Sequence, residues 1–75
     1  MAGAYQSPDT YVTYFPSSNE GTVELYRKHG SHTEFVIRLN DRVVAVTDKH
    51  LAFHWLLALV QPEHHGDVHR LYMEM

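Results

Sequence analysis

Asp48-Lys49-His50-Leu51-Ala52-Phe53-His54-Trp55-Leu56-Leu57-Ala58-Leu59-Val60-Gln61 is the one stretch of this chain that is long and apolar enough to predict a well-anchored helix. Asp48 suits the N-cap, because its carboxylate can accept a hydrogen bond from a first-turn N–H and favours the positive end of the helix dipole. Pro62 predicts the end of the helix, since the residue before a proline is pushed out of the α region. A membrane span needs ~20 apolar residues, so we expect no membrane-spanning segment here.

Apolar side chains occupy most of the circumference of this predicted helix. His50, His54, Leu57 and Gln61 fall near one side, and the other positions are almost all apolar. A helix with so wide an apolar arc is usually buried on more than one side. In a chain of 75 residues the second cover is predicted to come from another molecule, either a protein partner or a second copy in a homodimer.

Length and composition limit the classes of function. Seventy-five residues predict a single domain, residues 1–75, with a small core. The chain has no cysteine, which excludes disulfides and thiolate zinc sites. The net charge of −3 and the scattered lysines and arginines argue against binding to a phosphate backbone. Since no signal-peptide pattern follows Met1, the expected location is the cytoplasm.

Short strands are predicted on both sides of the helix. Alternating β-branched and aromatic residues predict a strand over 10–15, with Tyr11, Thr13 and Phe15 on one face. Further strands are predicted over 22–28, 33–39 and 42–47, and a last one over 68–73, with Leu71 and Met73 on one side. Residues 1–9 are predicted to form a flexible arm.

The connections between strands predict which residues face one another. Asn40 and Asp41 suit a two-residue hairpin, because both tolerate positive φ. That turn pairs Phe35 with Val46. We expect the helix to pack on the apolar face that this pairing produces, which comprises Phe35, Ile37, Leu39, Val44 and Val46. Between the second and third strands, a three-residue loop pairs Leu25 with Phe35. An even loop would pair Tyr26 with Phe35 and reverse the face; we prefer the first.

Together these elements predict an α+β fold: an antiparallel β-meander of four to five strands with one α-helix packed across one face.

Histidine is the unusual residue type, with seven in the chain. His50 and His54 are spaced i, i+4, which lets two imidazoles reach one metal ion, and His65 is a candidate third ligand. Leu51 follows His50, so the HExxH pattern of metalloproteases is absent. The alternative is that these histidines are ordinary polar-face residues. A pH-responsive module is a further hypothesis, because protonation of all seven would move the formal charge from −3 to +4.

Catalysis finds little support in the sequence. The serines lie in turn or arm sequence, and none lies in a Gly-x-Ser-x-Gly elbow. No glycine-rich phosphate loop is present either. We therefore expect no enzymatic activity and no cofactor.

Tyrosine and tryptophan exceed what one small core can absorb, and both are enriched at binding hot spots. The candidate partner-binding residues are Tyr11, Tyr14, Tyr26, Trp55, Leu57 and Tyr72. A sheet with exposed aromatics can also stack nucleic-acid bases, but only Arg27, Lys28 and Arg38 are near enough to supply positive charge.

The leading hypothesis is therefore a small non-catalytic protein that binds another protein. We expect an inhibitor or regulator that covers a surface of a larger protein, of the kind that phages and mobile elements direct at host machinery. The alternatives are a histidine metal-binding or pH-responsive module and a weak binder of single-stranded nucleic acid.

Overall fold

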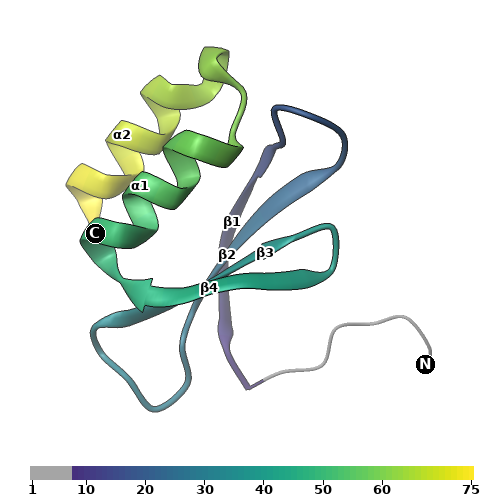
Figure 1. Ribbon diagram of the computed structural model, residues 1–75. Helices are drawn as coiled ribbons and strands as arrows, with labels where there is room; N and C mark the ends of the chain where they lie inside the picture. The colour runs from purple at the N-terminus through teal and green to yellow at the C-terminus, as the bar shows by residue number, and fades with distance from the viewer. Residues whose placement is uncertain (1–7) are drawn as a thin grey trace.

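A four-stranded antiparallel sheet forms one layer of the molecule. The structure, a computed structural model, describes residues 8–75. Its strands are β1 (Thr10–Pro16), β2 (Thr22–Arg27), β3 (Glu34–Leu39) and β4 (Arg42–Asp48), and they pair in chain order, so that β1 and β4 are the edges (Figure 1). The predicted α+β meander is thus confirmed.

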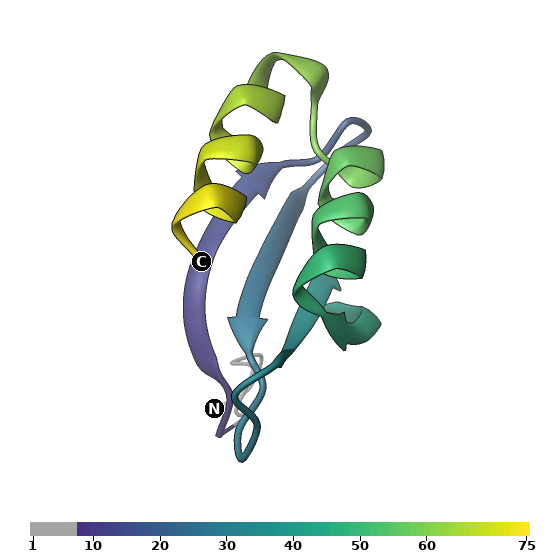
Figure 2. The ribbon, with the colours of Figure 1, turned by 90° about the vertical axis from the view of Figure 1, so that its left-hand side faces the viewer.

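Two helices form the second layer. They are α1 (Lys49–Leu59) and α2 (His65–Glu74), and a short 3-10 turn, η1 (Pro62–His64), joins them. The predicted cap is present, because the Asp48 carboxylate accepts a hydrogen bond of 2.9 Å from the backbone N–H of Leu51. Both helices lie side by side on the same face of the sheet, with α2 over β1 and α1 beside β3 and β4 (Figure 2).

The prediction of a fifth strand over 68–73 is wrong, since these residues belong to α2. Apolar residues recur here at helical spacing: Val68, Leu71, Tyr72 and Met75. Val68 is completely buried and Leu71 packs against the core, whereas Met73 is 69% exposed. The alternation that suggested a strand would have turned Leu71 and Met73 to the same side.

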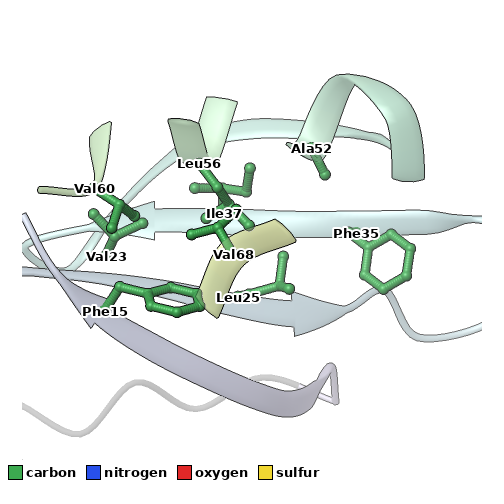
Figure 3. Close-up of a cluster of buried hydrophobic side chains, with 9 residues drawn as sticks. All are labelled: Phe15, Val23, Leu25, Phe35, Ile37, Ala52, Leu56, Val60 and Val68. Carbon is green, nitrogen blue, oxygen red and sulfur yellow. The ribbon is translucent and has the colours of Figure 1, made fainter. Parts of the chain in front are cut away.

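The core lies between the sheet and the helices (Figure 3). Each strand of the β1–β3 group contributes inward side chains, and the helices close the core with α1 residues and with Val68 from α2. The buried cluster contains Phe15, Val23, Leu25, Phe35, Ile37, Ala52, Leu56, Val60 and Val68. The isolated bridge between Ser17 and Val60 ties the end of α1 to the end of β1.

A β-bulge changes the predicted register of β4. Asn40 and Asp41 form the expected turn with φ values of 51° and 69°. Arg38 pairs with Val43 as predicted, but Ile37 pairs with Ala45, so that Val44 is an extra residue. Val46 consequently faces away from the helices, opposite Val36, and the prediction that it lies under the helix is wrong. Ala45, a small side chain, packs against the core instead.

A second β-bulge lies in β1. The register shifts between Tyr11 and Thr13, so Tyr11 pairs with Tyr26 while Thr13 pairs with Leu25. Tyr11 therefore lies on the face opposite to Thr13 and Phe15, which corrects the prediction that all three share a face. The extra residue, Val12, packs against the core.

Between β2 and β3, the prediction of which side chains share a face is correct, but the predicted pairing is shifted by two residues. Leu25 pairs with Ile37 and not with Phe35, because the connecting segment is longer than three residues. Of the predicted arm over residues 1–9, only Pro8 and Asp9 are among the described residues. The Asp9 carboxylate accepts a hydrogen bond of 2.8 Å from the His29 backbone N–H.

Candidate functional site

The face of the sheet that the helices leave uncovered carries a group of large side chains, which we call the tyrosine face. It comprises Tyr11, Tyr14, Tyr26, Val43 and Val46. Tyr14 is 60% exposed, and Tyr11, Val43 and Val46 are each about half exposed. The helices pack on the other face of the sheet, where the buried cluster lies, so no helix of residues 8–75 covers these exposed apolar and aromatic side chains.

Two of the tyrosines form a cross-strand pair. Tyr11 lies directly opposite Tyr26, and their rings meet edge to face, with centroids 5.7 Å apart and an interplanar angle of 73°. Such pairs contribute to sheet stability and hold both rings in place. The Tyr26 hydroxyl donates a 3.4 Å hydrogen bond to Glu24 Oε1. The rings are thus ordered before any partner arrives, which lowers the entropic cost of binding.

A buried arginine lies at the centre of this face. Arg38, on the inner strand β3, is only 5% exposed. Its Nη1 donates a 3.4 Å hydrogen bond to Glu24 Oε1 and lies 3.9 Å from Asp41 Oδ1. Tyr26 and Arg38 therefore meet on the same carboxylate oxygen. The guanidinium is fixed by its carboxylate neighbours, and it holds the polar middle of the face rigid.

Burial and the Glu24 carboxylate change the acidity of the tyrosine pair. Burial is the main cause that raises the pKa of Tyr26, and the negative charge of Glu24 adds to it, while Arg38 acts in the opposite direction. Burial and then Glu24 also raise the pKa of Tyr11. Both phenols are therefore neutral hydrogen-bonding groups at physiological pH.

Carboxylates outnumber cations around the tyrosine face. By strand alternation Glu24 and Glu34 share the face with Tyr26 and Val36, and Asp41 lies at the end of the β3–β4 hairpin. Asp48, which pairs with Glu34, adds a fourth carboxylate, and the cations are Arg38 and Lys28, whose backbone N–H donates a hydrogen bond to the Glu34 carbonyl oxygen. Four carboxylates against two cations leave the surroundings of the face net negative. A partner surface with positive charge around an apolar centre would complement it.

The other predicted partner-binding residues lie in the helix layer. Trp55 is 40% exposed on α1, while Leu57 is partly buried against the core. Tyr72, on α2, packs at the seam between the helices, where its ring centroid is 4.5 Å from that of Phe53. The six candidates therefore divide: three tyrosines gather on the sheet, and Trp55, Leu57 and Tyr72 lie in the helix layer.

The structure does not bring the three candidate metal ligands together. The His50 Nδ1 atom is 2.7 Å from the Tyr72 hydroxyl, and the His65 Nε2 atom is 3.0 Å from the Val60 carbonyl oxygen. His54 is exposed on α1. Within residues 8–75, no group of three or more histidine or carboxylate side chains has an arrangement that could hold a metal ion.

Val43, Val46 and Arg38 were absent from the predicted site. Val46 joins the tyrosines because the bulge in β4 turns it outward, and a bulge of one residue leaves no pattern in the sequence. Val43 pairs with Arg38 as predicted and was on the outward side without the bulge. Arg38 was identifiable in part, since it alternates with the inward residues Ile37 and Leu39 on a strand with neighbours on both sides.

Comparison of the chain with protein-family models, with curated proteins and with solved structures gives no match. In the described part of the chain, neither helix has the length and apolar character that crossing a membrane requires.

Proposed function

We propose that this chain is a small non-catalytic protein that binds a larger protein through the tyrosine face. One observation supports this proposal most directly: on the sheet face that the helices leave open, four large side chains are each about half or more exposed, namely Tyr11, Tyr14, Val43 and Val46. Tyrosine supplies large contact area with few rotatable bonds, which is why it is common at binding hot spots. Binding would cover a surface of the partner protein. The chain would act as an inhibitor or regulator by making that surface inaccessible.

The partner that fits this face has an apolar centre and a rim of lysine or arginine. The apolar centre would pack on the exposed rings and valines, and the basic rim would meet Glu24, Glu34 and Asp41. Like charges would oppose a nucleic-acid phosphate backbone at the same place. These charges favour a protein partner over single-stranded nucleic acid, even though exposed aromatics could stack bases. A regulator of the kind that phages or mobile elements encode is a prediction from the size and character of the chain.

The test compares capture of a partner by the wild-type chain and by two variants. We expect Tyr11→Ala/Tyr14→Ala to lose a partner that the wild type retains, and we expect the partner to elute as the salt concentration rises. Met73→Ser is the matched control, because Met73 is exposed on the opposite layer. The captured protein is then purified and its affinity for each chain measured by calorimetry. Equal affinity for the wild type and the double variant would contradict the proposal.

A further inference from the structure

The two edges of the sheet differ in what lies beside them. At the β1 edge, α2 places charged side chains over the strand: Asp67, Arg70 and Glu74 line a shallow hollow with Thr13 and Phe15. Pro16, which cannot donate a backbone hydrogen bond, also ends this strand. Charged neighbours and proline are features that protect an edge strand from pairing with another chain. The β1 edge is therefore poorly suited to association.

At the β4 edge the neighbouring helix surface is apolar. On α1, the residues that line the gap toward α2 include Lys49, Phe53 and Leu56. With 3.6 residues per turn, Leu51, Trp55 and Ala58 lie about half a turn away from that stripe. They therefore lie on the side of α1 that is turned away from α2, and α1 itself packs beside β3 and β4. Together with His54 they line a shallow open hollow, which we call the α1 flank.

The α1 flank is exposed although most of it is apolar. Leu51 is 53% exposed and Trp55 is 40% exposed. Beside it, β4 is an edge strand to which no strand of residues 8–75 pairs on the outer side. Its interior, residues 43–47, carries no charge and includes the exposed Val43 and Val46. A bulge is present in both edge strands, so the bulge does not distinguish them.

We infer that a second copy of this chain docks here, with β4 antiparallel to β4 of its mate and the two α1 flanks packed together. A two-fold axis beside β4 makes the surface self-complementary, because each subunit supplies both the strand and the helix flank. The charges of β4 support this arrangement. Arg42 begins the strand and Asp48 ends it, so in an antiparallel pair the two Arg42 side chains lie at opposite ends, as do the two Asp48 side chains, and no like charges of β4 oppose one another.

Charge also argues against the other self-association, in which two tyrosine faces meet. The carboxylates Glu24, Glu34 and Asp41 would then face the same net negative surroundings on the second copy, and like charges across an interface disfavour it. Docking at the β4 edge leaves both tyrosine faces uncovered. The dimer therefore does not depend on the function proposed for the tyrosine face.

Sedimentation equilibrium and tryptophan fluorescence test this inference on the full chain. Trp55 is the single tryptophan of the chain, so its emission should shift to longer wavelength as the dimer dissociates on dilution. Leu51→Glu should raise the dissociation constant at least about tenfold, because it places a charge in the apolar flank. His54→Glu, at an exposed position of the same flank, is the second variant. Tyr14→Ser, on the tyrosine face, is the matched control and should leave the constant unchanged.

A wild-type chain that stays monomeric up to about 1 mM would overturn the inference. So would a dimer that Tyr14→Ser breaks while Leu51→Glu and His54→Glu leave it intact, since that result would place the contact on the tyrosine face. Loss of the dimer in both flank variants, with circular dichroism like that of the wild type, would support it.

Discussion

Single residues decide how the open face of the sheet is held together, and Arg38 is the clearest case. A guanidinium that is 5% exposed must be paired, and Glu24 and Asp41 supply the opposite charge. We expect Arg38→Met to lower the free energy of unfolding by about 2 kcal/mol, because it leaves the partly buried Glu24 carboxylate without its cation. The double variant Arg38→Met/Glu24→Gln should recover about half of that loss. Urea denaturation measures both, and equal losses in the single and double variants would contradict this explanation.

The tyrosine pair gives a prediction about alkaline pH. Burial and Glu24 raise the pKa of Tyr26 above its ordinary value of 10.0, so the folded chain holds this proton more tightly than the unfolded chain. The resulting stability is fully present below pH 10 and is lost as the pH rises through the folded-state pKa. We expect Tyr26→Phe to lose less stability than the wild type between about pH 10 and pH 11 in urea titrations. Tyr14→Phe, at the most exposed ring of the face, is the control, and an identical alkaline slope in all three chains would rule the prediction out.

At the scale of elements, the sequence predicted the helix and the hairpin whose ends carry residues with a local chemical signal. Asp48 and Pro62 bounded α1, and Asn40-Asp41 identified the tightest hairpin. The two bulges were not predictable, because one extra residue on a strand depends on how Ala45 and Val12 pack and not on a pattern. The composition identified the tyrosines as candidates, but Tyr11 and Tyr14 share a face only because of the bulge in β1, which the alternation of residues 10–15 did not predict. Val46 required the observed register of β4, whereas the predicted pairing of Arg38 with Val43 already placed Val43 on this side.

The helix α2 shows how two periodicities can compete in a short segment. Residues 68–73 alternate well enough for a strand, but Val68, Leu71 and Met75 also recur at helical spacing, and the packing against α1 decides. We expect Val68→Ala to lower the free energy of unfolding by about 2 kcal/mol, because its side chain is fully buried. Met73→Ala should change it by less than about 0.5 kcal/mol. Thermal or urea unfolding compares the two; a larger effect at Met73 would favour the strand arrangement.

At the scale of the whole molecule, one small core must stabilise a chain that exposes apolar surface in two places. The buried cluster lies on one side of the sheet only. The tyrosine face and the α1 flank lie outside it and are separated by the sheet, so both can be occupied at once. Docking of two copies along β4 would also join two sheets into one, with two tyrosine faces side by side on the same surface. A partner with repeated sites would then bind with higher avidity than a single subunit allows.

This arrangement predicts that thermal stability depends on protein concentration. A dimer that forms only from folded chains stabilises the folded state by mass action, so a hundredfold rise in concentration should raise the midpoint of thermal unfolding by ~5 °C. The Leu51→Glu variant, with the α1 flank charged, should show a midpoint that does not change with concentration. Circular dichroism in cells of different path length, or differential scanning calorimetry, measures the midpoint at each concentration. A wild-type midpoint independent of concentration would mean that the folded chain is stable without a second copy, and that the exposure of Leu51 and Trp55 has another cause.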